Sequence, residues 1–177
     1  MAAKVLVLFL FCAASAWQSF KLEGPDRAIC SDGSTPLYFL DVPPSASRWL
    51  LYLPGGAACN NPQMCEERIQ HFQGLTSSSL ETGDFSHATG IFSRDCSRNP
   101  LFCEAAFLYA IYCSSDLWLG DSELTLPSGA QFYFRGLEIV KATFDRIFPL
   151  MSTAREVFLA GNSAGGIASF VLADRLK

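Results

Sequence analysis

The chain has 177 residues, which is enough for one domain or for part of one. Hydrophobic residues make up 50% of it, a fraction that excludes a disordered chain. The formal net charge is −4, and charges of both signs are mixed along the sequence, so no basic patch is available to bind nucleic acid.

The first 16 residues are typical of a secretory signal peptide. Lys4 supplies a short positive segment, residues 5–12 form an apolar run, and Ala14-Ser15-Ala16 fits a cleavage site. A membrane anchor is the alternative, but the apolar run is well short of the ~20 residues that a spanning helix needs. We therefore expect residues 17–177 to form a mature, secreted protein without a membrane-spanning segment.

The sequence has seven cysteines, of which Cys12 lies in the predicted signal peptide. The remaining six are Cys30, Cys59, Cys65, Cys96, Cys103 and Cys113. An even number in a secreted chain indicates disulfides, and six cysteines allow 15 connectivities. Bridges Cys59–Cys65 and Cys96–Cys103 would close short loops and leave Cys30 for Cys113. A zinc site is the weaker alternative, because the sequence has no C-x-x-C and neither histidine has ligand-like spacing to the cysteines. We predict no metal and no cofactor.

The first predicted elements are two strands and a helix. Residues 35–42 and 48–53 are rich in aromatic and apolar side chains, and the turn-like stretch between them predicts a β-hairpin. Residues 60–72 suit a short helix, with Asn60 or Asn61 as the cap and a proline in the first turn.

The second half of the chain alternates strands and helices. Residues 105–113 are a continuous apolar run, as in a strand buried on both faces, and residues 130–150 have the spacing of an amphipathic helix. Residues 155–161 predict the next strand and residues 164–176 the next helix. This order predicts an α/β domain with a mainly parallel sheet.

The stretch "GNSAG" fits G-x-S-x-G, the nucleophile elbow of α/β-hydrolases, with Gly161 and Gly165 around Ser163. A serine in this motif occupies a strained turn between a strand and a helix, and the glycines allow neighbouring backbone to approach closely. The alternatives are a glycine-rich packing turn or a phosphate-binding loop. Neither G-x-x-x-x-G-K-[ST] nor G-x-G-x-x-G is present, so we expect Ser163 to be a nucleophile.

Acyl transfer also needs N–H donors for the developing oxyanion. In α/β-hydrolases one donor is the N–H after the serine, here that of Ala164, and another comes from a loop after an early strand. Gly55 and Gly56 follow the strand predicted at residues 48–53, and Ala57 can present a further N–H. An ordinary Gly-Gly turn is the alternative. The combination of this loop with the elbow favours an oxyanion hole made of Gly56, Ala57 and Ala164.

Several blocks of sequence stand in an order that resembles one family. They read "LYLPGGAACNNPQMCEERI", "TGIFSRDCSRNPLF", "IYCSSDLWLGD", "FRGLEIVKATFDRI" and "VFLAGNSAGGIASFVLADR". Together they resemble the pectin acetylesterase and Notum family, whose members are secreted α/β-hydrolase-like carboxylesterases. The resemblance covers roughly residues 28–177.

The resemblance implies a carboxylic ester hydrolase whose substrate is an acylated polysaccharide or an acylated protein. Carried over by position, it implies Ser163 as nucleophile and Gly56, Ala57 and Ala164 as oxyanion donors. It also implies the bridges Cys59–Cys65 and Cys30–Cys113, with Cys96–Cys103 as an extra pair. The chain departs from the family in having Ala57-Ala58 where an aromatic residue is usual and Pro54 where an acidic one is usual. The substrate of neither branch therefore carries over.

Two further residues, Asp116 and Trp118, are expected near the pocket mouth. We favour a structural interpretation of both, with the aspartate capping its loop and the tryptophan packing on the sheet, over direct substrate contact.

A base for the serine is not evident. His71 and His87 both precede Ser163, whereas the α/β-hydrolase order places the acid and the histidine after the serine, so both are expected to be surface residues. Asp174 is expected to be a solvated helix residue. The resemblance implies a longer domain, with the acid and the base in its other part. We therefore expect residues 17–177 to be the N-terminal half of that domain.

Two other functions stay open. One is a catalytically inactive secreted binding or regulatory protein on the same scaffold. The other is a disulfide-stabilised extracellular adhesion module, which would not hydrolyse esters in any extended form.

Overall fold

The computed structural model describes residues 17–24, 27–80, 83, 85 and 88–174. The predicted signal peptide and His87 lie outside these ranges. Within them, no helix is long and apolar enough to cross a membrane.

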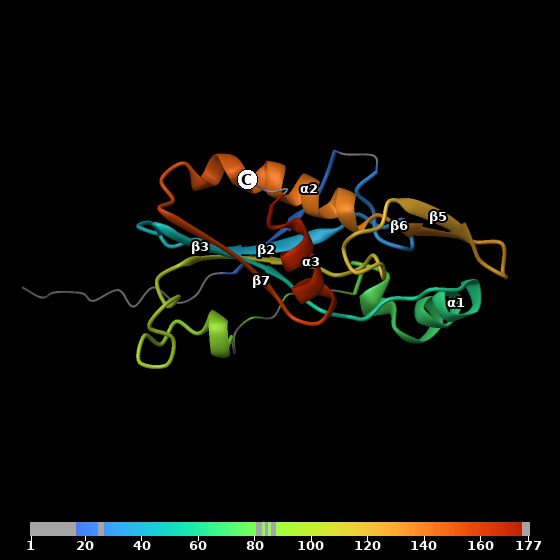
Figure 1. Cartoon of the computed structure of the whole chain (residues 1–177), viewed down its shortest axis with the longest axis horizontal. Helices are drawn as coiled ribbons and strands as arrows, with labels where there is room; N and C mark the ends of the chain where they lie inside the picture. The colour runs from blue at the N-terminus through green and yellow to red at the C-terminus, as the bar shows by residue number, and fades with distance from the viewer. Residues whose placement is uncertain (1–16, 25–26, 81–82, 84, 86–87, 175–177) are drawn as a thin grey trace, which may run out of the picture.

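A mixed sheet forms the centre of the molecule (Figure 1). It has five strands in the order β1-β2-β4-β3-β7. Its strands are β1 (Gln18–Lys21), β2 (Leu37–Asp41), β3 (Arg48–Leu53), β4 (Ala106–Ala110) and β7 (Glu156–Gly161). Strands β4, β3 and β7 run parallel to one another, whereas β1 and β2 are antiparallel to their neighbours. The prediction of an α/β fold with a mainly parallel sheet is confirmed.

The predicted hairpin between residues 35–42 and 48–53 is wrong. Strand β4 lies between β2 and β3 and pairs with both, antiparallel to β2 and parallel to β3. The physical reason is the apolar character of β4, because Phe107 and Leu108 are fully buried and need cover on both faces. The connection between β2 and β3 has only to cross one strand, about 10 Å at the usual strand spacing.

Three α-helices accompany the sheet: α1 (Pro62–His71), α2 (Gly136–Ile147) and α3 (Ala164–Leu172). Helix α1 begins as expected, because the side chain of Asn61 caps it by accepting from the Met64 N–H at 2.9 Å. Short 3-10 turns occur at η1 (Gln73–Leu75), η2 (Gly90–Phe92) and η3 (Phe148–Met151).

The helix predicted for residues 130–150 begins later than expected. Residues Gln131–Phe134 form strand β6, which pairs antiparallel with β5 (Ser122–Thr125) in a separate two-stranded sheet. Aromatic side chains favour extended backbone. The side chain of Phe132, in β6, is fully buried against Cys59, Cys65 and Leu126. The positive φ of Gly129, 85°, permits the turn between the two strands.

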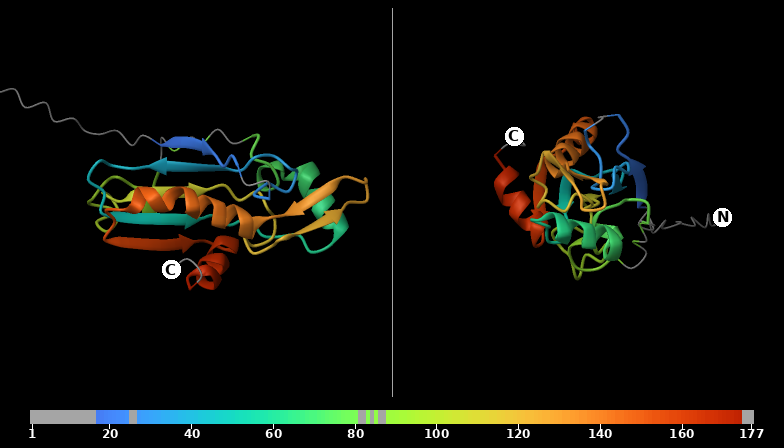
Figure 2. Two further views of the ribbon diagram at one scale, coloured as in Figure 1. Left: turned by 90° about the horizontal axis from the view of Figure 1, so that it is seen from above. Right: turned by 90° about the vertical axis from the view of Figure 1, so that its right-hand side faces the viewer.

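Alternate residues of the central strands face two different apolar clusters. Leu51 and Leu108 belong to the cluster that includes the inward side of α2, whereas Leu50 and Phe107 pack with Phe102 in a second cluster. Figure 2 shows α2 lying along the sheet, with α3 beside it next to β7. Apolar clusters therefore cover both faces of the sheet. Because β3, β4 and β7 are parallel, their carboxyl ends lie at the same end of the sheet.

Three disulfides join Cys30 to Cys113, Cys59 to Cys65 and Cys96 to Cys103. All three agree with the predicted pairs. The first two fasten the segments that follow β4 and β3, which meet at the carboxyl edge of the sheet.

Candidate active site

Ser163 occupies the turn between β7 and α3. Its backbone has φ 48° and ψ −119°, a left-handed conformation that costs a non-glycine residue about 1–3 kcal/mol. The residue is exposed, and within the described residues no hydrogen bond engages its hydroxyl. The turn thus presents a free hydroxyl at the amino end of α3, where the helix dipole favours negative charge.

The glycines on either side of Ser163 are required by the backbone of β3. A Cβ on Gly165 would lie 1.8 Å from the carbonyl oxygen of Leu53, and one on Gly161 would lie 2.5 Å from the same atom. The added Cβ of Gly161 would also come within 2.4 Å of the Gly165 backbone. No side chain fits at either position unless the backbone shifts.

The loop after β3, residues 54–57, lies directly against this turn. A Cβ on Gly55 would be 2.7 Å from the Cβ of Ser163, and the Gly55 N–H donates to Asn162 Oδ1 at 2.9 Å. Tyr52 also donates its hydroxyl to Asn162 Oδ1, at 3.1 Å. The structure therefore brings together two segments that lie about a hundred residues apart in the sequence.

Unpaired N–H groups occur on both of these segments. Ala164 is the first residue of α3, so its N–H has no partner within the helix. In the described part of the chain, no backbone carbonyl accepts a hydrogen bond from the N–H of Gly56 or of Ala57. These are the three residues that the sequence proposes as oxyanion donors.

The carbonyl groups of the same loop are held by three side chains, of which only Trp118 was expected near the site from the sequence, and then only as a packing residue. Trp118 Nε1 donates to the oxygen of Pro54 at 3.0 Å, Arg68 Nη2 to that of Gly56 at 2.5 Å, and the Tyr112 hydroxyl to that of Ala57 at 2.6 Å. Local sequence carries no signal for these contacts, because each joins different segments of the chain.

Asp116 has a structural role. Its carboxylate accepts from the Ser114 hydroxyl at 2.6 Å, from the Trp118 N–H at 3.0 Å and from the Gly136 N–H at 2.7 Å. It therefore ties the loop after β4 to the first turn of α2. Burial raises the pKa of the Asp116 carboxyl, although these hydrogen bonds oppose the shift. Trp118 is fully buried, which agrees with the packing role expected for it.

No base contacts Ser163 within the described residues. His71 lies on the exposed last turn of α1, and Asp174 is exposed just beyond α3. Neither forms a hydrogen bond with the serine hydroxyl.

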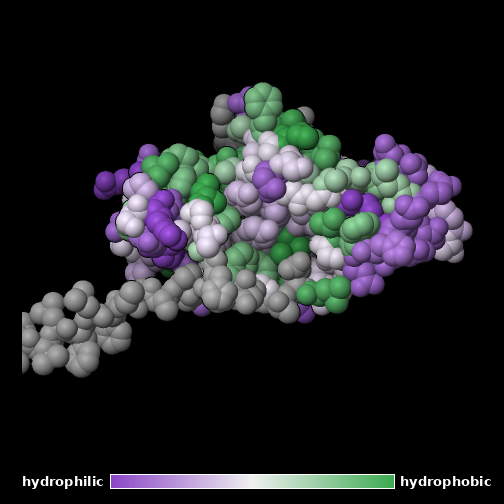
Figure 3. All heavy atoms as spheres, turned by 90° about the horizontal axis from the view of Figure 1, so that it is seen from below, coloured by the Kyte–Doolittle hydropathy of each residue, from purple (hydrophilic) through white to green (hydrophobic). Residues whose placement is uncertain are grey.

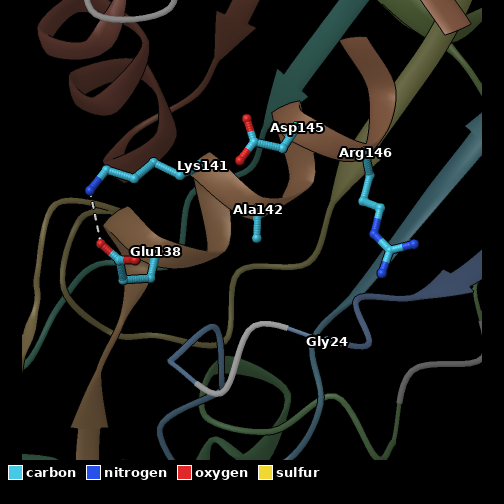
Figure 4. Close-up of a pocket in the computed structure, with 6 residues that line it drawn as sticks. All are labelled: Gly24, Glu138, Lys141, Ala142, Asp145 and Arg146. Carbon is cyan, nitrogen blue, oxygen red and sulfur yellow. Dashed lines mark hydrogen bonds and ion pairs between the residues drawn. The ribbon is translucent and has the colours of Figure 1, made fainter. Parts of the chain in front are cut away.

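Hollows occur both at this site and away from it. A cavity of about 130 Å³ adjoins the loop after β3 and is lined by Pro54, Gly55, Gly74, Leu75, Tyr109, Ile111 and Tyr112. A separate hollow beside α2 is lined by charged side chains, of which Lys141 pairs with Glu138 at 2.9 Å while Asp145 and Arg146 point in different directions (Figure 4). The charged side chains of this second hollow do not point toward a common centre. Only the first cavity adjoins the loop that lies against Ser163, so it is the one relevant to the candidate site.

Comparison with known proteins places these features in a family. The model of the pectinacetylesterase family matches residues 18–177. A palmitoleoyl-protein carboxylesterase, notum2 of Xenopus laevis, is 33% identical over 148 residues, which are 83% of this chain and 30% of that protein. Pectin acetylesterase 5 of Arabidopsis thaliana is 34% identical over 153 residues, which are 85% of this chain and 35% of that protein.

A solved structure shows the same fold. The Wnt deacylase Notum from Drosophila superposes with a TM-score of 0.76 at 25% identity, over 89% of this chain and 46% of that one. This chain spans about a third of the length of the curated relatives it matches. Because the family model matches nearly the whole sequence, the chain belongs to the pectinacetylesterase family.

Proposed function

We propose that the chain carries the nucleophile and the oxyanion hole of a secreted serine carboxylesterase. The observation that carries this proposal is the exposed Ser163 hydroxyl, which stands in a strained turn against a loop with unpaired N–H groups. Strained backbone that the surrounding structure holds in place is a feature of active sites. The names of the relatives, carboxylesterase and pectin acetylesterase, support the same reaction class.

The proposed reaction proceeds in two steps. Ser163 Oγ loses its proton to a base and attacks the carbonyl carbon of the ester, and the carbonyl oxygen becomes an oxyanion that accepts from the N–H groups of Ala57 and Ala164, with Gly56 as a further donor. Collapse of this intermediate expels the alcohol, which takes up the proton, and leaves an acyl-serine. Water then attacks the acyl-serine, and the carboxylic acid leaves while Ser163 regains its proton.

We propose that the acid and the base come from a further part of the family domain, so that residues 17–177 correspond to its N-terminal half. The coverage of the relatives supports this proposal, since the chain matches about a third of each curated relative and 46% of the solved Notum chain. In the described part of the chain, β7 also pairs on one side only, with β3. An apolar hollow of about 680 Å³ adjoins this edge and is lined in part by Phe144, Phe148 and Val157.

The surface near this edge supports the same proposal. Phe170 on α3 is 88% exposed, Phe148 is 58% exposed and Val157 on β7 is 51% exposed. Exposed apolar side chains of this size, next to a strand that pairs on one side only, are typical of a surface that another segment covers. On the side of the molecule away from α2, apolar atoms are scattered among hydrophilic ones, while the end that carries α1 is mostly hydrophilic (Figure 3).

The proposed substrate is an acylated ester on a polysaccharide or on a protein, as in the names of the relatives. The cavity beside Gly55 is the proposed site for the acyl group. Its lining includes apolar side chains such as Leu75 and Ile111, which suit an acyl chain. The three disulfides support secretion, because such bonds persist in oxidising compartments.

Two tests address the proposed enzyme. The first reads the gene downstream of the codon for Lys177, where an in-frame aspartate and histidine in α/β-hydrolase context are expected. The second measures hydrolysis of 4-nitrophenyl acetate by the extended protein that this sequence encodes. We expect Ser163→Ala to lower turnover at least ~1,000-fold, and Ser128→Ala, at an exposed turn, to leave it unchanged. Unchanged turnover in Ser163→Ala would refute the nucleophile.

A catalytically inactive secreted binding or regulatory protein is the second candidate. It predicts a genuine stop codon with transcript support, and no ester hydrolysis by any extended form.

A further inference from the structure

The loop after β3 is held along its carbonyl side. Arg68 from α1 and Tyr112 from the segment after β4 donate to the carbonyl oxygens of Gly56 and Ala57. The Tyr112 hydroxyl also accepts from the Leu117 N–H at 2.8 Å, so both functions of this hydroxyl are used. The Tyr112 ring also packs tightly against Gly56: a Cβ added to this glycine would lie only 2.4 Å from a ring carbon.

A hydrogen bond that fixes the orientation of a carbonyl group also fixes the orientation of the N–H of the next residue. A peptide group is planar and trans, so its C=O and N–H point in opposite directions. The Pro54–Gly55 peptide illustrates this rule, since its carbonyl accepts from Trp118 and its N–H donates to Asn162. By the same geometry, the contact of Arg68 with the Gly56 carbonyl directs the Ala57 N–H away from Arg68.

Arg68 is also unusual in being a charged side chain that is almost completely buried. It is only 8% exposed, its Nε donates to the Ser115 hydroxyl at 3.0 Å, and no carboxylate forms an ion pair with it in the described part of the chain. Arginine stays protonated in proteins, so a positive charge stands behind the loop. A cation bound to a carbonyl polarises that peptide and strengthens its N–H as a donor.

We propose that Arg68 is a positioning residue for the oxyanion hole, which orients the Gly56–Ala57 peptide and strengthens the Ala57 N–H as a donor. Tyr112 is the second hold, on the Ala57 carbonyl. The inference rests on the proposed function, because it assigns a purpose to the donors named there. A purely structural role for Arg68 would stabilise the fold without affecting the binding of an anion to the loop.

The test uses acetate as a mimic of the oxyanion and follows the amide resonances of Ala57 and Ala164 in the ¹⁵N-labelled secreted chain. Chloride at equal ionic strength is the control for screening. We expect acetate to shift both resonances in the wild type, and Arg68→Met to weaken acetate binding about tenfold. Arg68→Lys keeps the charge and should restore part of the affinity. Arg98→Met removes an exposed arginine and should change nothing.

Thermal unfolding of each variant separates positioning from stability. The proposal is overturned if acetate shifts neither resonance in the wild type, or if folded Arg68→Met binds acetate as the wild type does. If Arg68→Met does not fold, Arg68→Gln decides, because its amide can still donate to the Gly56 carbonyl but carries no charge. We expect Arg68→Gln to weaken acetate binding, and wild-type affinity in folded Arg68→Gln would overturn the proposal.

The acetate experiment can be told apart from a test of the esterase itself, because acetate binding needs the N–H donors but not the Ser163 hydroxyl. Ser163→Ala keeps every N–H donor and should still bind acetate. A chain that binds acetate through Ala57, but whose extended form hydrolyses no ester, would refute the esterase and leave the role of Arg68 intact.

Discussion

Substitution of Gly165 by alanine tests the close packing of the serine turn against β3. The added Cβ would lie 1.8 Å from the Leu53 oxygen and 2.7 Å from the Pro54 oxygen. An ordinary contact needs about 3.4 Å, so backbone must move by more than 1 Å, and over-packing of this kind costs about 3 kcal/mol. For a chain of this size we expect the melting temperature to fall by about 6–12 °C.

Gly166→Ala is the matched control in the next position. Its Cβ would meet the Gly161 oxygen at 3.3 Å, and alanine favours a helix over glycine by about 0.5–1 kcal/mol. Differential scanning calorimetry of both variants gives the comparison directly. Equal melting temperatures for Gly165→Ala and Gly166→Ala would refute the argument that β3 requires a glycine at position 165.

Three other predictions concern stability. Ser163→Gly should raise the free energy of unfolding by about 1 kcal/mol in a denaturant titration, because glycine adopts φ 48° without strain, and a loss would contradict this. Replacing Cys30 and Cys113 by serine should cost about 4–5 kcal/mol, since the bridge spans 83 residues, and a cost no larger than for a short-loop bridge would refute it. Burial raises the pKa of Asp116, so the stability that this group contributes is complete below about pH 4 and is lost as pH rises through the raised pKa. Relative to Asp116→Asn, the wild type should lose stability over that interval, and a constant difference would contradict this.

Local sequence predicted the features that depend on local geometry. The glycines at 161 and 165 follow from the steric demands of a strand–turn–helix junction, and the apolar run at 105–113 follows from burial on both faces. The three disulfides could be predicted because two pairs close short loops and leave one pair over.

Features that depend on contacts between distant segments were missed. Nothing in residues 35–53 shows that β4 will separate β2 from β3, because strand order depends on which strand most needs cover. The aromatic residues at 131–134 fit a helical spacing as well as a strand, and the hairpin with β5 decides between them. Arg68 resembles a solvated helix residue until the loop that it binds is placed beside it.

The central claim, that Ser163 is the nucleophile, is tested most directly by trapping the acyl-enzyme. The extended protein is treated with a slowly hydrolysed 4-nitrophenyl ester, quenched in acid and digested with trypsin. Residues 156–175 form one peptide that contains both Ser163 and Ser169, and Ser169 serves as the internal control because its hydroxyl donates to the Gly165 carbonyl at 2.8 Å. We predict that fragmentation places the acyl group on Ser163 alone. Ester hydrolysis with Ser163 unmodified, or with the acyl group on another residue, would contradict the account.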